Sequence, residues 1–120
     1  MNSDSLSVER FSGPNGPGIL CFRGPLIKEN VYSFQNAVRR EETTPTMILD
    51  FTEVPYMDSS GLGSLVNAYL TQRKAGRQVA LAGVNDRVYK LLQITKLEGQ
   101  FLIFSTVDEA MAAFGGAAEA

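Results

Sequence analysis

The chain contains short apolar runs, separated by longer stretches in which apolar residues recur at helical spacing. Runs of four or five such residues are typical of strands that helices cover on both faces of a sheet. A weaker pattern at Leu6, Val8 and Phe11 predicts a short strand before the first run. The runs that predict strands lie at 19–23, 47–51, 78–82 and 101–104.

Four further segments have the spacing of an amphipathic helix. The first ends at Thr43-Thr44-Pro45, and the second reaches about Lys74 and ends at Gly76. Each begins after a side chain that is able to cap a helix N-terminus. The expected caps are Asn30 for the first helix, Asp58, Ser59 or Ser60 for the second, Asn85 or Asp86 for the third and Thr106 for the fourth.

These elements follow the order ββαβαβαβα. Strands that alternate with helices imply a mostly parallel sheet with right-handed crossovers. The first two strands, joined by a turn-rich loop at 12–18, are expected to pair antiparallel. We therefore predict an α/β fold with one sheet of about five strands, antiparallel at its N-terminal edge and packed with about four helices. No repeat or linker divides the sequence, which predicts one domain over 1–120 with its core at about 6–114.

Composition restricts the classes of function. The 120 residues are 44% hydrophobic and carry a net charge of -2, so the chain is able to bury a core but lacks the basic surface typical of nucleic acid binding. No run of 18 apolar residues predicts a membrane span, and the first ten residues do not resemble a signal peptide. The single cysteine, Cys21, falls in a predicted strand and suits a reducing compartment. These features predict a cytoplasmic protein without membrane or nucleic acid partners.

The chain has no histidine. A Ser-His-Asp or Cys-His nucleophile and a zinc site built from His and Cys are therefore excluded. No spacing of carboxylates indicates a magnesium or calcium site, so we expect no metal and no cofactor. An enzyme with Ser59 or Ser60 as nucleophile would need Lys or a carboxylate as base, and no Gly-x-Ser-x-Gly motif is present. Nucleotide binding has little support, because Gly61 and Gly63 lack the third glycine of a dinucleotide fingerprint. We expect a binding module rather than an enzyme.

The segment Asp58-Ser59-Ser60-Gly61-Leu62-Gly63 lies between a predicted strand and the second helix. In open α/β sheets, binding sites collect at the carboxyl ends of the strands. One capping residue is sufficient for a helix, yet three candidates stand together here. Gly61 and Gly63 are poor helix formers, and we expect their lack of side chains to leave the first turn bare. The segment thus predicts a hydroxyl that another protein is able to reach, with a simple helix cap as the alternative.

A phosphate on that hydroxyl would lie at a helix N-terminus, where the helix dipole favours a negative charge by roughly 0.3–1 kcal/mol. Asp58 would oppose it through like charge. Phosphorylation is therefore expected to leave the helix intact and to add about -1.5 to -2 charges to a surface that a partner must desolvate. The pattern predicts a switch that releases a partner rather than one that unfolds a helix.

The sequence resembles the STAS domains of bacterial anti-sigma factor antagonists, also called anti-anti-sigma factors. The resemblance rests on Tyr56 to Gly63 after Ile48-Leu49-Asp50-Phe51, on 88–97 and on the close at 101–114. It covers about residues 6–114 and implies the STAS fold, in agreement with the predicted order of elements.

In that family, an anti-sigma factor that is itself a serine kinase binds the unmodified antagonist, and the sigma factor is thereby freed. The kinase phosphorylates the first hydroxyl residue after the aspartate, and a phosphatase of the PP2C type reverses this. By position, the resemblance implies phosphorylation at Ser59, supported by Asp58, Ser60, Gly61 and Gly63.

We expect the partner to bind the surface around Ser59. Tyr56 and Met57 could give the partner an apolar contact there, and could equally fill the core under the loop. The expected partner-binding residues are Tyr56, Met57, Asp58, Ser59, Leu62 and Ser64.

The sequence departs from the family pattern in two places. The family often has Gly-Glu-Leu/Ile-Asp after the second strand, near the kinase-binding side, whereas this chain has Gly24-Pro25-Leu26-Ile27 followed by Lys28 and Glu29. The family also usually has glycine where Lys96 stands. The missing acids favour, as an alternative function, a STAS scaffold subunit of a stressosome-like or other signalling assembly. Attachment to an anion transporter is not favoured, because the sequence shows no membrane segment.

Overall fold

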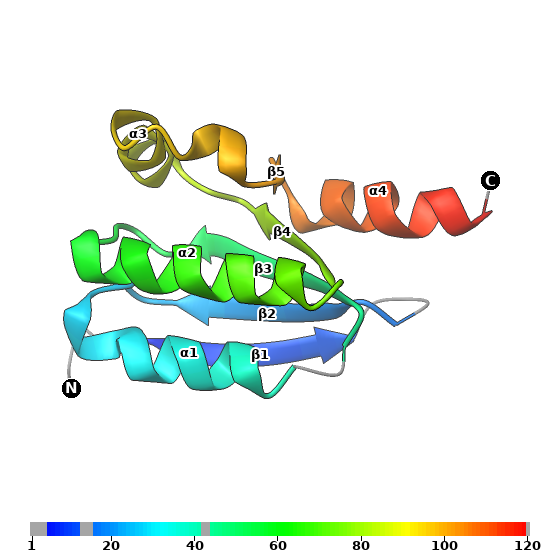
Figure 1. Cartoon of the computed structure of the whole chain (residues 1–120), viewed down its shortest axis with the longest axis horizontal. Coiled ribbons are helices and arrows are strands. Elements are labelled where there is room, and N and C mark those ends of the chain that lie inside the picture. The colour runs from blue at the N-terminus through cyan, green and yellow to red at the C-terminus, as the bar shows by residue number, and fades with distance from the viewer. Residues whose placement is uncertain (1–4, 13–15, 42–43, 120) are drawn as a thin grey trace.

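The computed structural model describes residues 5–12, 16–41 and 44–119. The described residues form a five-stranded sheet in the order β1-β2-β3-β4-β5 (Figure 1). β1 and β2 are antiparallel and the other neighbouring strands are parallel, which confirms the predicted sheet. The strands are β1 (Ser7–Ser12), β2 (Gly18–Arg23), β3 (Thr46–Glu53), β4 (Gln78–Ala82) and β5 (Ile103–Phe104).

Four α-helices are present in the described part of the chain, which confirms the predicted class. Two single 3-10 turns, η1 and η2, accompany them. Residues 13–15 of the expected loop and Thr43 at the expected end of the first helix lie outside the described residues. The helical elements are η1 (Lys28–Asn30), α1 (Val31–Arg39), α2 (Ser59–Lys74), α3 (Asp86–Ile94), η2 (Glu98–Gln100) and α4 (Val107–Glu119).

The two faces of the sheet pack against different helices. The main core lies on the face covered by α1 and α2, which run side by side in front of the sheet in Figure 1. Phe22, Phe34 and Phe51 meet there with ring centroids 5.1 to 6.3 Å apart. On the other face, Ala110 of α4 packs against Ile48. The buried strands are thus apolar on both faces, as the continuous apolar runs predicted.

The fifth strand is shorter than the predicted run at 101–104, and only Ile103 and Phe104 are in strand conformation. The preceding two residues are held by Tyr69 of α2 instead. The ring of Phe101 packs edge-on against the Tyr69 ring at 4.6 Å, and the backbone N–H of Leu102 donates to the Tyr69 hydroxyl at 2.8 Å. An apolar run does not distinguish a strand from a segment that is anchored by one buried aromatic side chain.

Three of the four predicted helix caps are confirmed. In each case a side-chain oxygen accepts a hydrogen bond from a backbone N–H in the first turn. The bonds join Asp58 to Gly61 at 2.7 Å, Asn85 to Val88 at 2.8 Å and Thr106 to Glu109 at 3.1 Å.

The prediction for Asn30 is wrong, because its side chain makes no capping bond to α1. Asn30 is buried, and its Nδ2 donates to the carbonyl oxygen of Pro25 at 2.8 Å. The amide therefore holds the segment after β2 rather than the helix. Burial decided between these roles, because a buried amide must use its donors as well as its acceptor.

Candidate functional site

The first turn of α2 is fixed to the segment after β2 by Asp58. One carboxylate oxygen, Oδ1, accepts from the backbone N–H of Gly61 at 2.7 Å, and Oδ2 accepts from that of Lys28 at 3.0 Å. Partial burial disfavours the charged form, but these backbone donors outweigh it and lower the pKa of Asp58. Asp58 is therefore a carboxylate at neutral pH that ties two loops at the carboxyl edge of the sheet together.

Gly61 allows α2 to approach the backbone of Leu26. A Cβ atom at Gly61 would lie 1.8 Å from the Leu26 carbonyl oxygen, far inside contact distance. Leu26 also forms a bridge with the chain before α2, since its N–H donates to the Tyr56 carbonyl at 3.1 Å and its carbonyl accepts from the Asp58 N–H at 3.3 Å. The expectation that Gly61 leaves the first turn bare is wrong, because Leu26 covers it.

Gly63 behaves as expected. It is exposed, and a Cβ atom built there would meet no atom within 4 Å. The two glycines of the motif thus have different roles: Gly61 is a packing requirement, and Gly63 leaves open surface beside the start of the helix.

Ser59 and Ser60 are the first two residues of α2, and both are exposed. Neither hydroxyl forms a hydrogen bond with another side chain or backbone group in the described part of the chain, and Asp58 provides the cap. The two serine hydroxyls are therefore not needed to cap the N-terminus of α2. Their hydroxyls lie on the surface at a helix N-terminus, as the sequence predicted for a modifiable residue.

Three residues expected to bind a partner are buried. Leu62 and Met57 belong to the main core, and Met57 thereby takes the second of its two expected roles. The Ser64 hydroxyl is also buried and donates to the Gly61 carbonyl oxygen at 2.8 Å. The expectation of side-chain contact through Leu62 and Ser64 does not fit this structure, because helical periodicity turns both toward the sheet. Tyr56, Asp58 and Ser59 remain at least partly accessible.

Helix α3 lies beside this segment, and its residues Arg87 and Lys90 were not assigned to the site by sequence analysis. The guanidinium of Arg87 lies over the ring of Tyr56, 4.9 Å from its centroid. A shallow hollow of about 220 Å³ opens next to this pair. Its lining residues are Met57, Arg87, Lys90, Leu91 and Ile94.

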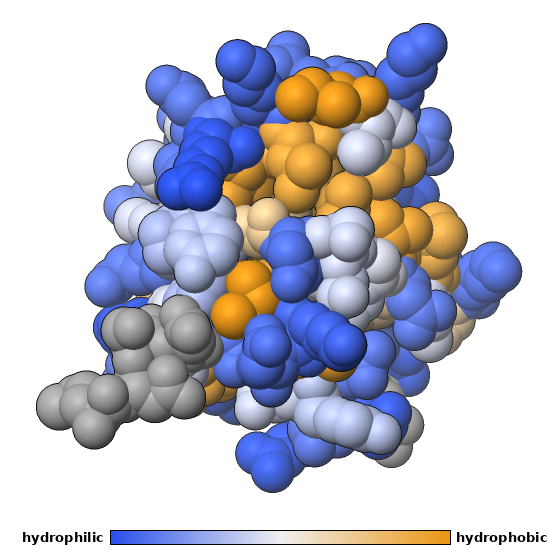
Figure 2. Space-filling view, turned by 90° about the vertical axis from the view of Figure 1, so that its left-hand side faces the viewer, coloured by the Kyte–Doolittle hydropathy of each residue, from blue (hydrophilic) through white to orange (hydrophobic). Residues whose placement is uncertain are grey.

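The hollow joins an apolar area with basic side chains at its border. Ile94 is 68% exposed, which is unusual for a large aliphatic side chain at the end of a helix. Figure 2 views the face toward which the parallel strands point, and an orange apolar area lies in its upper right part, at the height of α3 in Figure 1. The signal in the sequence was Ile94 at helical spacing from Leu91, outside the buried pair Val88 and Leu92.

The described residues lack two features, a cluster of metal-ligating side chains and a membrane-spanning helix. No group of three or more His, Cys, Asp or Glu side chains there is arranged to hold a metal ion. Within the same residues, no helix is long and apolar enough to cross a membrane.

The chain belongs to the STAS domain family, because the family model matches residues 10–110. A curated relative, the anti-sigma-B factor antagonist of Listeria monocytogenes, is 35% identical over 79 residues, which are 64% of this chain and 63% of the relative. The match thus spans less than two thirds of that protein.

Solved structures agree with this assignment. A Thermotoga maritima protein, provisionally assigned as an anti-sigma factor antagonist, is 27% identical with a TM-score of 0.81 and covers 88% of this chain and 92% of its own. The anti-sigma factor antagonist SpoIIAA in its unphosphorylated form is 19% identical with a TM-score of 0.75, over 92% of this chain and 97% of its own. The second likeness shows the fold alone.

Proposed function

We propose that this protein is an anti-sigma factor antagonist that acts in the cytoplasm. When Ser59 is unmodified it binds an anti-sigma factor that is also a serine kinase, and when Ser59 is phosphorylated it releases that partner. A phosphatase of the PP2C type restores the binding form. The observation that carries the proposal is an exposed Ser59 at the start of α2 whose hydroxyl is not used by the fold. The names of the relatives support the class of partner.

The geometry supports a switch that changes the surface and not the fold. Both oxygens of Asp58 are directed to backbone N–H groups, so the cap stays in place when a phosphate is added to the neighbouring serine. The N-terminus of the 16-residue helix α2 tolerates the new charge. The phosphate adds about -1.5 to -2 charges beside the ionised Asp58. A partner that covers this surface must desolvate all of that charge, which lowers its affinity.

We propose that the partner covers Ser59 together with the neighbouring hollow on α3. Tyr56 and the hollow next to Ile94 offer apolar contact, and Arg87 and Lys90 offer positive charge. Interfaces are typically centred on such partly buried aromatic and aliphatic residues with a charged rim. A surface of this kind fits a partner with an apolar patch and acidic residues at its border.

The first experiment is site-resolved phosphopeptide mass spectrometry on the protein isolated from its own cells, before and after treatment with a PP2C-type phosphatase. We expect a phosphatase-sensitive phosphate on Ser59. Absence of phosphate from both serines across growth and stress conditions would contradict the switch.

Binding of serine variants to the co-purified kinase then distinguishes the role of Ser59 from that of Ser60. We expect Ser59→Asp to lose binding and Ser59→Ala to bind without release by ATP. Ser60→Ala is the matched control, since it removes the adjacent exposed hydroxyl and should retain both binding and release. If Ser59→Asp binds as tightly as the parent protein, the switch is wrong.

The second candidate function is a STAS scaffold subunit of a signalling assembly. The observation in its favour is the segment after β2, where Pro25, Leu26 and Ile27 are buried and carry no acid, while Lys28 is exposed. Size-exclusion chromatography with light scattering distinguishes the two functions. A large stable assembly without a kinase partner would support the scaffold.

A further inference from the structure

Strand β1 forms one edge of the sheet and pairs only with β2 among the described strands. All six of its residues are exposed. The outer backbone N–H and C=O groups of such a strand are able to pair with an added strand from another chain. Edge strands of this kind bind extended peptides when a neighbouring groove accepts the side chains.

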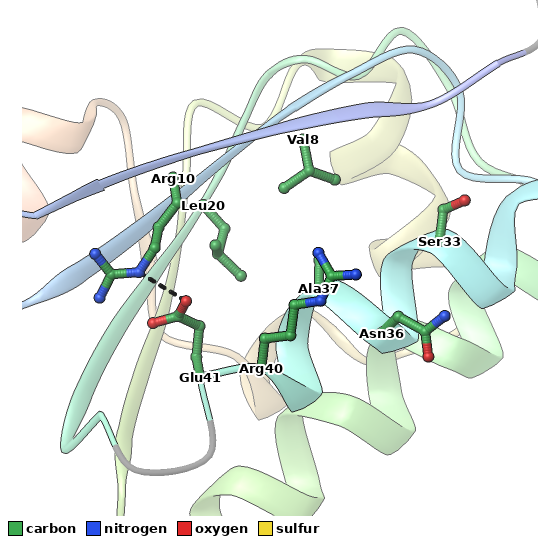
Figure 3. A pocket seen from close by; sticks show the side chains of 8 residues that line it. All are labelled: Val8, Arg10, Leu20, Ser33, Asn36, Ala37, Arg40 and Glu41. Atoms are coloured by element: carbon green, nitrogen blue, oxygen red, sulfur yellow. Dashed lines mark hydrogen bonds and ion pairs between the residues drawn. The ribbon is translucent and has the colours of Figure 1, made fainter.

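A groove of that kind lies between β1 and α1. It is a hollow of about 390 Å³, within the size range of about 300–1,000 Å³ that is typical of ligand pockets. Figure 3 shows its lining side chains, with those of Val8 and Leu20 directed into the space between the strand and the helix. The apolar lining residues are Val8, Leu20 and Ala37, and the polar ones are Arg10, Ser33, Asn36, Arg40 and Glu41.

The acid in this groove is already neutralised. Glu41 is buried, and its Oε2 accepts from Arg10 Nε at 2.7 Å while its Oε1 accepts from the Thr44 hydroxyl at 3.0 Å. Burial disfavours the charged form, but these bonds prevail and lower the pKa of Glu41. Arg10 and Glu41 therefore neutralise each other, and their ion pair lies at one end of the groove.

The ion pairs of the described residues do not include Arg40, which also lines the groove. Arg40 is exposed and forms no ion pair with any residue of the described ranges. In Figure 3 its guanidinium extends from the end of α1 into the hollow, beside Ala37 and below Val8. Among the described residues, the groove thus combines an apolar floor, a strand edge that no further strand covers and the charge of Arg40 without an ion-pair partner.

We propose that the groove between β1 and α1 binds an extended acidic segment of a partner protein. The segment pairs with the outer edge of β1, places an apolar side chain over Val8 and Leu20, and directs a carboxylate to Arg40. This surface is distinct from Ser59, because α1 ends and β3 begins near Glu41, whereas Ser59 follows the other end of β3. Binding here does not depend on the proposed switch.

A second copy of this chain fits the edge poorly. Residues directly opposite in an antiparallel pair share a face of the sheet. In a two-fold symmetric pair of β1 strands, the two registers with the largest overlap therefore place Glu9 opposite Glu9 or Arg10 opposite Arg10. Like charges directly opposite each other are destabilising.

The test begins with phage-displayed random octapeptides selected on the intact protein. We expect enrichment of peptides in which apolar or β-branched residues alternate with acidic ones. Amide chemical shifts of the ¹⁵N-labelled protein should change over Ser7–Ser12 and along α1 when a selected peptide is added, and a Ser59→Asp protein should bind that peptide equally well.

Charge reversal provides the decisive comparison. Arg40→Glu should weaken binding of the selected acidic peptide by about tenfold or more and should shift a new selection toward basic peptides. Arg39→Glu is the matched control, because Arg39 is exposed on the same helix and lines a different hollow beside α2. It should retain the preference for acids.

Four outcomes overturn the proposal. These are a selection without enrichment, equal binding by the Arg40→Glu and Arg39→Glu proteins, amide shifts confined to α2 and α3, and a dimer in light scattering whose interface is β1. Far-ultraviolet circular dichroism of both variants excludes loss of the fold as the cause of weaker binding.

Discussion

Helices α2 and α3 begin at the same edge of the sheet and are built on similar plans, but they meet different demands. Each has an Asx cap that also holds a neighbouring loop. Asp58 accepts from the Lys28 N–H, whereas the Asn85 amide donates to the carbonyl oxygens of Val54 and Pro55 at 3.3 and 3.1 Å. The loop beside α2 presents a donor and the loop beside α3 presents acceptors. The choice between acid and amide at each cap therefore matches the backbone groups of the neighbouring loop: a carboxylate faces an N–H donor, and an amide N–H faces carbonyl acceptors.

The C-terminal ends of the two helices share one backbone conformation but have different residues in it. The residue after each cap adopts a left-handed conformation, with φ of +83° at Gly76 after α2 and +60° at Lys96 after α3. In both, two backbone bonds close the last turn, as for Leu97 to Leu92 at 2.7 Å. Glycine meets this demand without strain and lysine does not. The left-handed position after α2 thus has the residue that favours this conformation, and the one after α3 does not.

The largest effect is expected from the two glycines of α2. Gly61→Ala should destabilise the protein by about 3 kcal/mol, because the new Cβ must displace the Leu26 backbone. Gly63→Ala is the matched control and should stabilise by about 0.5–1 kcal/mol, since its site is open and helical. Urea denaturation of both proteins measures the difference. Equal stability of the two variants would show that the close approach of α2 to Leu26 is not required.

A reciprocal exchange of the caps tests the comparison directly. Asp58→Asn sets an amide N–H against the Lys28 N–H, and Asn85→Asp sets a carboxylate against two carbonyl oxygens. Each should cost about 1–2 kcal/mol in the free energy of unfolding, although each new side chain is still able to cap its helix. Retained stability in either variant would mean that only the cap, and not the loop contact, matters there.

The pH dependence of stability isolates the contribution of the Asp58 charge. We expect this contribution to be smaller than the full loss of stability in Asp58→Asn. Because the pKa of Asp58 is lowered on folding, its contribution is complete above the unfolded value of about 3.9 and is lost as the pH falls through the folded value. The stability difference between the parent and Asp58→Asn should therefore shrink on acidification. Glu41 titrates in the same direction in both proteins, so it cancels in this difference. A difference that is constant from neutral pH to acid would contradict the assignment.

The smallest effect concerns the helix ends. Lys96→Gly should stabilise by about 0.5 kcal/mol, because relief of left-handed strain exceeds the additional backbone entropy of glycine. The reverse change, Gly76→Lys, should destabilise by about 1 kcal/mol and serves as the counterpart. Thermal unfolding of the two proteins is the measurement. Destabilisation by Lys96→Gly would indicate that the Lys96 side chain makes a compensating contribution.

For the functional site, the comparison of α2 with α3 shows which features sequence patterns predict and which they do not. The start of α2 carries a local signature, so the cap and the two accessible serines could be predicted from consecutive residues. The contact of Arg87 with Tyr56 could not, because these residues lie 31 positions apart in the sequence and meet only through the packing of α3 beside the loop before α2. Likewise, nothing around Gly61 indicates that Leu26 lies against it.

The sequence by itself determined the order of elements, the mixed sheet, three of the helix caps and the position of Ser59 at a helix start. These depend on periodicity and on bonds between residues close in the chain. Only the tertiary structure decided that Gly61 is covered while Gly63 is open, and that Arg40, which has no ion-pair partner among the described residues, lies beside β1. The physical reason is that exposure and pairing are set by which segments pack together, and contacts of that range leave no pattern in neighbouring residues.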